Sequence, residues 1–428
     1  NITIKNINIS GQEWHIDKSS NIEIENVDGL VIDGVYGNGH TINKGDSKGK
    51  TAISINNCSG VIEIKNCEIF NWGPYDLPKP GTDDFMGIAL TNMESGEYKI
   101  HDNKIYNINA DGIHVYLTKA NGAIHNNVLY NAGADAIGIK GSENCEIYDN
   151  EFYRTAEFLG EGGSGSEGLP AYINLHQVGE RFSKNNTIST NSFKDGDGVA
   201  IKLGSAQDTK INENIFSNVR TALYIKDLVK NTMFHHNIIE NPQSRLIASR
   251  NIDAGCIYEN NSDTGTQIFN NTIYNGKGNS KHLIALANSN KTTISKNIVY
   301  QNESSEDAFG LYYNPSATDP VITNNYWYNP AKINRTKYSN KIYTANMQEE
   351  WNQKNPGDRF DNPLMNDPEE GDYSLYEKGL ELGAVYDETD DSMAATDDTA
   401  VITDDSAAET DDSAVVTDDS VAATDDTA

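Results

Sequence analysis

The chain has 428 residues, of which 63 are acidic and 33 basic, so its formal net charge is -30. This charge argues against nucleic acid as a partner. Because the sequence lacks a run of about 18 apolar residues, we predict no membrane span. The four cysteines are too few for a disulfide framework and lack the spacing of zinc ligands, so we expect buried thiols.

Asparagines recur in one local context, each followed at once or after one residue by Ile, Val, Phe or Tyr. Their commonest separation is 23 or 24 residues, and the apolar runs between them are short, β-branched and alternating. A period of this size is typical of a solenoid built from strands. We therefore predict an all-β fold, a right-handed parallel β-helix over residues 1–386. The asparagines expected to hydrogen-bond from coil to coil are Asn103, Asn127, Asn150, Asn191, Asn214, Asn237, Asn271, Asn297 and Asn325.

Each coil is predicted to carry a strand with two inward residues separated by one outward residue. Such pairs include Ile113/Val115, Ile137/Ile139, Val199/Ile201 and Ile247/Ser249. The outward residues between the pairs form a first row: Ala89, His114, Gly138, Asn174, Ala200, Tyr224 and Ala248. The residues after the pairs form a second row: Thr91, Tyr116, Lys140, His176, Lys202, Lys226 and Arg250.

An acidic row is expected beside these two, because Asp111, Asp135 and Asp197 each stand two residues before an inward pair. Asp111 and Asp135 are one coil apart, so their carboxylates are expected to lie about 5 Å from each other. That geometry suits a calcium ion, which takes several oxygen ligands. It equally suits the carboxylate pair of a retaining glycosidase.

The basic row suggests acid–base chemistry on a charged polymer. Lys140 and Lys202 are candidate general bases, because neighbouring cations favour the neutral amine. His176 is a candidate acid or base, and His114 is either that or a sugar-binding donor. Side chains expected to bind neighbouring sugars or their carboxylates are His114, Tyr116, Lys226 and Arg250.

Two long turns are expected to border this region. The turn before residues 86–91 carries Trp72 and Tyr75, and the turn before residues 171–176 is the glycine-rich segment 160–168. Long loops on a rigid scaffold are where binding residues concentrate. We therefore predict a cleft in which Trp72 and Tyr75 contact the substrate.

Two short stretches resemble carbohydrate-active β-helix enzymes. Residues 109–115, Asn-Ala-Asp-Gly-Ile-His-Val, are similar to the Asn-Thr-Asp-Gly segment of polygalacturonases, which implies that Asp111 and Asp135 are active-site acids. Ala134 stands where that family has the first Asp of a pair. Residues 197–204, Asp-Gly-Val-Ala-Ile-Lys-Leu-Gly, resemble the base-bearing strand of a calcium-dependent pectate lyase family. That resemblance implies Lys202 as the base and Asp111, Asp135 and Asp197 as calcium ligands.

These observations favour an extracellular enzyme that cleaves a uronic-acid polysaccharide, such as pectate or alginate, by β-elimination. A glycoside hydrolase using Asp111 and Asp135 is the first alternative, and a C5-epimerase with Tyr116 and a histidine is the second. A non-catalytic surface adhesin is the third. Residues 362–375 resemble the closing segment of many secreted β-helix proteins. We expect a secreted or cell-surface monomer, already processed before Asn1, with an anionic polysaccharide as its partner.

The last 42 residues differ from the rest of the chain. Thr-Asp-Asp recurs at residues 389, 396, 403, 410, 417 and 424, and residues 387–428 hold 15 acidic residues and no Lys or Arg. Such a composition cannot bury enough apolar surface to fold. We therefore predict a disordered acidic tail over residues 387–428.

Overall fold

The computed structural model describes residues 5–16, 22–39, 51–73, 85–156, 170–243, 257–260, 265–278, 280, 282–287, 289–302, 308–313, 320–328, 336–338, 341–375 and 383–384. The chain divides into two units, Asn1–Tyr386 and Asp387–Ala428. The second unit lies outside the described residues, so the disorder expected for it stays a prediction.

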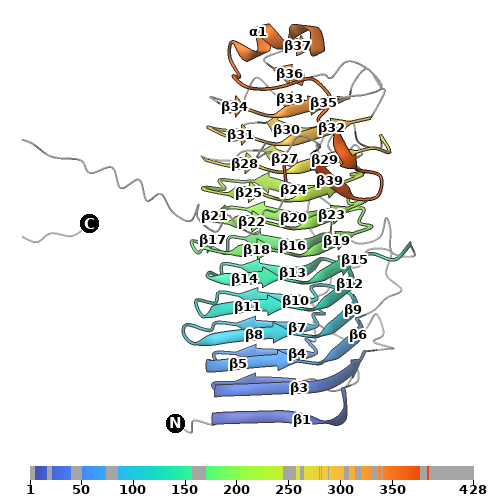
Figure 1. Ribbon diagram of the computed structural model, residues 1–428. Helices are drawn as coiled ribbons and strands as arrows, with labels where there is room; N and C mark the ends of the chain where they lie inside the picture. The colour runs from blue at the N-terminus through green and yellow to red at the C-terminus, as the bar shows by residue number, and fades with distance from the viewer. Residues whose placement is uncertain are drawn as a thin grey trace, which may run out of the picture. The chain divides into compact units, whose positions relative to one another are not determined.

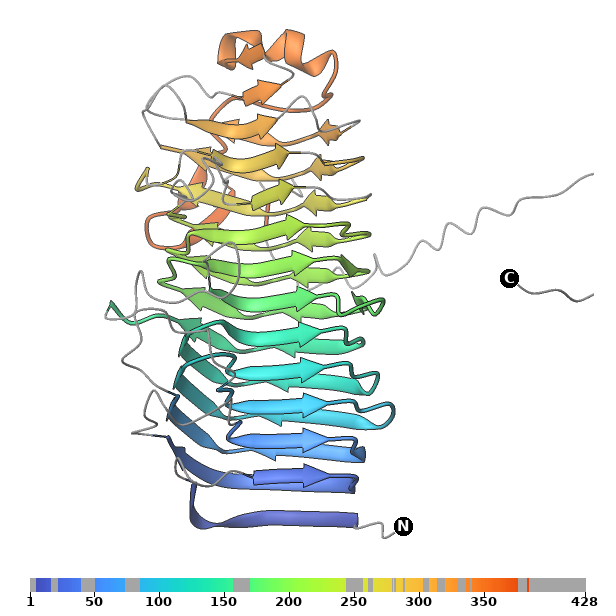
Figure 2. The same ribbon diagram turned by 180° about the vertical axis from the view of Figure 1, so that it is seen from behind.

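The first unit is a parallel β-helix whose coils follow one another in sequence order, from β1 to the short helix α1 (Figure 1). The same stack is visible from behind in Figure 2. Three columns of strands make up the successive coils, and neighbouring strands within a column are parallel except for the last pair of the first column. This arrangement confirms the all-β solenoid predicted from the asparagine period.

The first column forms a sheet of its own, in which every pair except the last is parallel. Its strands are β2 (Ile22–Glu25), β4 (Ile53–Asn56), β7 (Ile88–Thr91), β10 (Ile113–Tyr116), β13 (Asp135–Lys140), β16 (Ala171–His176), β20 (Val199–Gly204), β24 (Thr221–Lys226), β27 (Ile257–Asn260), β30 (His282–Ala287), β33 (Phe309–Tyr313), β36 (Thr336–Tyr338) and β37 (Lys341–Tyr343).

The second column consists of β5 (Ser59–Lys65), β8 (Glu97–His101), β11 (Asn121–His125), β14 (Cys145–Tyr148), β18 (Thr187–Ser189), β22 (Lys210–Asn212), β25 (Met233–His235), β28 (Gln267–Phe269), β31 (Thr293–Ser295) and β34 (Val321–Thr323). The third consists of β6 (Glu68–Trp72), β9 (Lys104–Ile108), β12 (Val128–Ala132), β15 (Glu151–Tyr153), β19 (Ser192–Lys194), β23 (Ile215–Ser217), β26 (Ile238–Glu240), β29 (Thr272–Asn275), β32 (Ile298–Gln301) and β35 (Tyr326–Tyr328).

The remaining elements lie at the ends of the stack, between columns or, in the case of β38 and β39, against β29 and β32 of the third column. The long strands β1 (Lys5–Ile16) and β3 (Asp28–Asn38) pair with each other, and β3 also pairs with β5 and β6. The others are β17 (Ser183–Lys184), β21 (Ala206–Gln207), the 3-10 turn η2 (Ala345–Met347), α1 (Gln348–Asn352), β38 (Met365–Asp367) and β39 (Asp372–Leu375). Within the described residues, no helix has the length and hydrophobicity that crossing a membrane requires.

The predicted asparagine ladder runs through the interior of the coils. From Asn103 onward each side-chain Nδ2 donates to Oδ1 of the next ladder asparagine across 2.9–3.0 Å, as far as Asn325. Each ladder Oδ1 from Asn127 onward also accepts the backbone N–H of the ladder asparagine before it, and Oδ1 of Asn103 accepts that of Cys67. Because buried polar groups are costly unless hydrogen-bonded, this ladder fixes the coil period.

Asp358 closes the ladder at its C-terminal end. Its Oδ1 accepts the backbone N–H and the Nδ2 of Asn325 at 2.7 and 3.0 Å. Its Oδ2 accepts the indole N–H groups of Trp327 and Trp351 at 2.9 and 2.7 Å. Cys58, Cys67 and Cys145 are buried free thiols, as expected.

Candidate active site

Asp111 and Asp135 occupy equivalent places in two neighbouring coils. Asp135 opens β13, and Asp111 stands two residues before Ile113, which pairs with Ile137 of β13. The backbone N–H of Asp135 donates to Oδ1 of Asp111 across 3.1 Å. The two residues are only 2% and 5% exposed. Asp111 and Asp135 therefore lie next to each other, as predicted, and both are largely shielded from water.

Two basic side chains meet the same oxygen of Asp111. Nδ1 of His114 lies 2.6 Å and Nζ of Lys140 lies 2.8 Å from Asp111 Oδ2. Burial alone would raise the pKa of Asp111, but the hydrogen bond from His114 and the charge of Lys140 lower it to about 2. Asp111 is therefore ionised across the neutral range.

Asp135 is shifted in the opposite direction. Burial and the charge of Asp111 raise the pKa of Asp135 to about 6, against smaller opposing effects of Lys140 and Asn174. Lys140 Nζ lies 3.5 Å from Oδ2 of Asp135, and Nδ2 of Asn174 donates to the same oxygen across 2.9 Å. The two carboxyls therefore have well-separated pKa values, about 2 for Asp111 and about 6 for Asp135, and such a separation is one that acid–base catalysis uses.

Lys140 is held as an ammonium ion. Burial would lower the pKa of its amine, but the charges of Asp111 and Asp135 raise it. A raised pKa does not suit the general-base role predicted for Lys140, since a base must be unprotonated. Lys140 instead suits the binding of an anion or the donation of a proton.

Four basic residues lie on consecutive strands of the first column: Lys140 on β13, His176 on β16, Lys202 on β20 and Lys226 on β24. His176 is exposed. Partial desolvation and the charges of Lys226, Lys202 and Lys140 lower the pKa of His176 below its usual 6.5. Its imidazole is therefore uncharged at neutral pH, and it can accept a proton.

Two glycines leave room beside these side chains. A Cβ at Gly138 would lie 3.1 Å from Asp111 Oδ2 and 3.2 Å from Lys140 Cε. A Cβ at Gly204 would lie 2.7 Å from Nδ1 of His176. Both glycines occupy outward positions, opposite Asn174 and His176 respectively in the strand register.

The predicted row assignment of Lys202 is wrong by two residues. Lys202 pairs with Asn174 and Tyr224, which places it in the first outward row, and Gly204 holds its expected place beside His176. The apolar alternation at Val199, Ile201 and Leu203 fits either register, so the pattern could not distinguish them. Lys202 nevertheless remains close enough to affect the pKa of both His176 and Asp135.

The same register removes Asp197 from the acidic row. Asp135 pairs with Ala171 and Ala171 with Val199, so Val199 takes the place expected for Asp197. Oδ1 of Asp197 instead lies 3.7 Å from a guanidinium nitrogen of Arg154.

Arg250 and Tyr75 lie outside the described residues. The strand that pairs with β24 is Ile257–Asn260, so the position opposite Lys226 predicted for Arg250 belongs to Asn260. The predicted inward pair Ile247/Ser249 is therefore replaced in this sheet by Ile257 and Glu259.

Trp72 does not line the site. It is the last residue of β6, it is fully buried in the hydrophobic core, and it pairs with Ile108. The prediction that Trp72 contacts the substrate is wrong, because the indole faces inward. Tyr116, in contrast, lies in the outward row as predicted, with its ring stacked on His114 at a centroid distance of 5.7 Å.

The acid pair as it stands does not fit a calcium ion. The Lys140 ammonium already contacts both carboxylates, and Asp197 is elsewhere. Among the described residues, no group of three or more His, Cys, Asp or Glu side chains could hold a metal. Calcium binding stays a prediction from the sequence.

Asn174 is a site residue that the sequence did not single out. It appeared in the predicted outward row, but an asparagine there carries no catalytic signal by itself. Its contact with Asp135 Oδ2 depends on the spatial neighbourhood of β13 and β16, which are separated by residues 141–170. Only the coil register could have revealed it.

A comparison with protein families agrees with the architecture. Residues 86–283 match the family model described as a right handed beta helix region. No curated protein matches the chain. Similar solved structures include a periplasmic alginate epimerase, AlgG, with 11% identity over 76% of this chain and 63% of that chain, at a TM-score of 0.41.

Two further structures have the same level of likeness. A variant of the alginate lyase AlyGC has 13% identity over 89% of this chain and 53% of that chain, at a TM-score of 0.48. A DFA-IIIase from Arthrobacter chlorophenolicus A6 has 12% identity over 75% of this chain and 83% of that chain, at a TM-score of 0.47. The chain thus spans 63% and 53% of the length of the epimerase and the lyase. At these identities the likeness concerns the fold alone.

Proposed function

We propose that this right-handed parallel β-helix is a polysaccharide lyase that cleaves a uronic-acid-containing chain by β-elimination. The observation that carries the proposal is the group of basic residues on β13, β16, β20 and β24, with the uncharged imidazole of His176 among three lysines. A polymer of uronic acids carries one carboxylate per sugar. Cations on successive coils, spaced by about 4.8 Å, suit the binding of such a chain.

In the proposed reaction the lysines first lower the barrier to proton loss. Lys202 and Lys226 bind the carboxylate of the reacting sugar, which stabilises negative charge developing at C5. His176 accepts the C5 proton on a ring nitrogen. The electron pair of that C–H bond forms the C4–C5 double bond, and the C4–O bond breaks.

The leaving oxygen takes a proton from Lys140, which the acid pair holds as an ammonium ion. Asp111 fixes the place of Lys140, because its Oδ2 accepts a hydrogen bond from Lys140 Nζ, and His114 holds the same oxygen in position. The products are one chain with an unsaturated, non-reducing end and one with an ordinary reducing end.

The test is digestion of pectate and alginate while the ultraviolet absorbance of the unsaturated uronate is followed, with and without added calcium. We expect the absorbance to grow for the wild type and to remain flat for His176→Ala. Thr91→Ala, an outward substitution in the same row on β7, is the matched control and should keep the activity. Absence of growth on every uronan, with and without calcium, contradicts the proposal.

A glycoside hydrolase is a second candidate, favoured by the opposite pKa shifts of Asp111 and Asp135. In that reaction Asp135 would protonate the leaving oxygen and ionised Asp111 would act as nucleophile or stabilise the developing positive charge. It predicts saturated products, and loss of activity in both Asp111→Asn and Asp135→Asn while His176→Ala stays active.

Uronic-acid polymers are materials of cell walls and matrices. We therefore propose that the protein works outside the cell or at its surface.

A further inference from the structure

A second candidate site lies on the second column of strands. A hollow of about 470 Å³ opens on β8, β11, β14 and β18. In the strand register, Lys99, Ala123, Glu146 and Thr187 form one outward row through it. Because the side chain of Ala123 ends at Cβ, a gap one coil wide separates Lys99 from Glu146. Gly122 and Ala123 form the floor of this gap.

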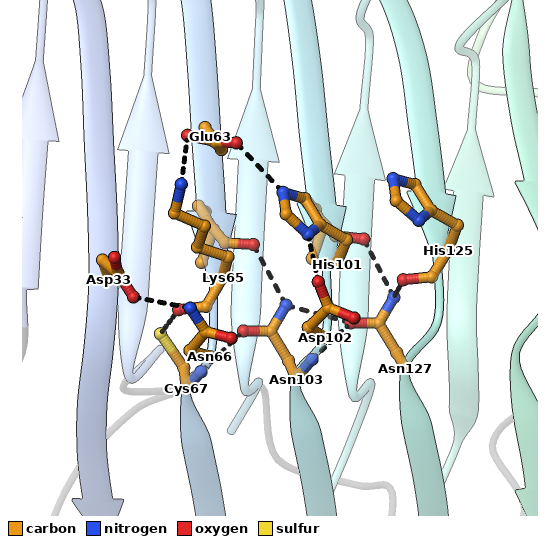
Figure 3. A network of polar contacts seen from close by, with 12 residues as sticks. Asp33, Glu63, Lys65, Asn66, Cys67, His101, Asp102, Asn103, His125 and Asn127 are labelled. Atoms are coloured by element: carbon orange, nitrogen blue, oxygen red, sulfur yellow. Dashed lines mark hydrogen bonds and ion pairs between the residues drawn. The ribbon is translucent and has the colours of Figure 1, made fainter.

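Five of the polar side chains around the hollow are not engaged by other described residues, whereas Nδ2 of Asn185 donates to Oδ1 of Asn144 across 3.3 Å. Lys99, Glu97, Glu146, Asn121 and Thr187 line it, and none makes a side-chain hydrogen bond or ion pair with another described residue. Figure 3 shows the opposite situation on the same column, where Glu63 bridges Lys65 and His101 across 2.9 and 3.1 Å. Ion pairs also join Glu143 to Lys184 and Glu151 to Lys194. Unused donors and acceptors around a hollow are what a polar ligand requires.

The mixture of groups defines the chemical class of that ligand. The lining offers an ammonium donor, two carboxylate acceptors (Glu97 and Glu146) and the amides of Asn121, Asn144 and Asn185. An anion would face two carboxylates and a single Lys99. A cation would meet that lysine and would lack the acceptor cage of a metal site. Hydroxyl groups both donate and accept, so a neutral, hydroxyl-rich ligand satisfies all of these side chains.

We propose that this hollow binds a neutral sugar unit of a polysaccharide, apart from the charged cluster on the first column. The volume lies within the range of about 300–1,000 Å³ that small-ligand sites occupy. Besides its polar groups, the hollow is lined by Tyr98, Gly122 and Ala123, and its apolar surface suits a sugar ring. The site does not depend on the lyase chemistry, so it binds its ligand whether or not the protein cleaves uronans.

The test is calorimetric titration with neutral hexasaccharides of glucose, mannose and xylose, and with hexagalacturonate. Ala123→Phe fills the gap, and Met233→Phe is its matched control on the same outward row, two strands beyond Thr187. We expect at least one neutral hexasaccharide to bind wild type and Met233→Phe equally, and Ala123→Phe at least about tenfold more weakly. Asn121→Ala, which removes only an exposed amide, should weaken binding in the same direction.

Three results overturn this inference. They are the absence of binding of every neutral hexasaccharide, binding of hexagalacturonate alone, and unchanged affinity in both Ala123→Phe and Asn121→Ala. Loss of binding in Met233→Phe as well would place the ligand elsewhere on the column, which is a fourth result that overturns the inference. Thermal midpoints of all variants establish that each one is folded.

Discussion

The Lys140 ammonium lies 2.8 Å from the Asp111 carboxylate of the preceding coil and 3.5 Å from the Asp135 carboxylate of its own strand. One cation therefore serves two buried acids. Without the Lys140 ammonium, the two neighbouring carboxylates would be negatively charged with little water to solvate them. With it, an ammonium group lies at an outward position beside His176. Stability and the proposed chemistry thus depend on the same contact.

Lys140→Met should destabilise the protein at pH 7 by about 3–5 kcal/mol, because it leaves a buried charge uncompensated. The loss should be smaller at pH 4, where Asp135 takes up a proton. Chemical denaturation at both pH values measures the difference. Lys104→Met, which breaks an exposed pair with Glu68, is the control and should change stability little. Equal losses of stability for Lys140→Met at the two pH values would contradict the predicted dependence on the protonation of Asp135.

The stability of the wild type should depend on pH through Asp135. Its pKa in the folded protein is raised from 3.8 to about 6, so it favours folding when protonated. Its contribution to the free energy of unfolding is fully present below about pH 4 and is lost as the pH rises to about 6. Asp135→Asn should remove this decline. A denaturation series from pH 4 to 7 on both proteins tests it, and parallel curves would show that Asp135 does not titrate there.

Asp111 should have the opposite effect. Its folded pKa is lowered from 3.8 to about 2, so it stabilises the protein above about pH 4 and loses this effect as the pH falls to about 2. Asp111→Asn should therefore be less stable than wild type at pH 5 and should approach it at low pH. A difference between the two proteins that stays constant down to pH 2 would exclude this assignment.

Lys226 should set the acidic limit of activity. Its charge contributes to lowering the pKa of His176, and the proposed base must be unprotonated. Lys226→Met should therefore move the acidic limb of the kcat profile to higher pH, in addition to weakening substrate binding. Lys210→Met, on the second column, should leave the limb in place. A profile that keeps its shape in Lys226→Met would argue against His176 as the base.

Asp358→Ala should destabilise the C-terminal coils strongly. The backbone N–H of Asn325 and the indole N–H groups of Trp327 and Trp351 would lose their acceptor, and unsatisfied buried donors cost about 1–3 kcal/mol each. Asp361→Ala is the matched control and should be nearly neutral, because the exposed carboxylate of Asp361 pairs with the half-buried Arg359 near the protein surface. Hydrogen exchange of the last coils measures the local effect. Similar exchange in both variants would show that Asp358 does not hold the ladder end.

Truncation after residue 386 should leave the thermal midpoint and the activity on soluble substrate unchanged. The acidic repeats contain no apolar periodicity that could pack against a β-helix. A drop of several degrees would show that residues 387–428 contribute to folding.

The ladder asparagines were predictable because a buried amide must find a partner in every coil, which imposes a sequence period. Asp111 and Asp135 were predictable for a related reason, since they are separated by one uninterrupted coil. Lys202 was misplaced because strand periodicity is two, and Val199, Ile201 and Leu203 satisfy it in either of two registers. Trp72 was misjudged because an aromatic residue next to a long turn can face either side of the strand.

The length of an insertion also limits what a sequence predicts. The strand after β24 begins at Ile257, although the repeat alone placed an inward pair at Ile247 and Ser249. Asn174 and Asp135 are separated in the sequence by an insertion of this kind. Their contact therefore depends on the strand register, which the local sequence pattern does not determine.

The most direct test of the proposed function is the mass and proton spectrum of the oligosaccharides released from pectate or alginate. We predict products that are lighter by one water molecule than the hydrolysis products and that carry a vinyl proton at C4, formed by wild type and not by His176→Ala. Saturated products of full hydrolysed mass, formed equally well by His176→Ala, would contradict the elimination mechanism.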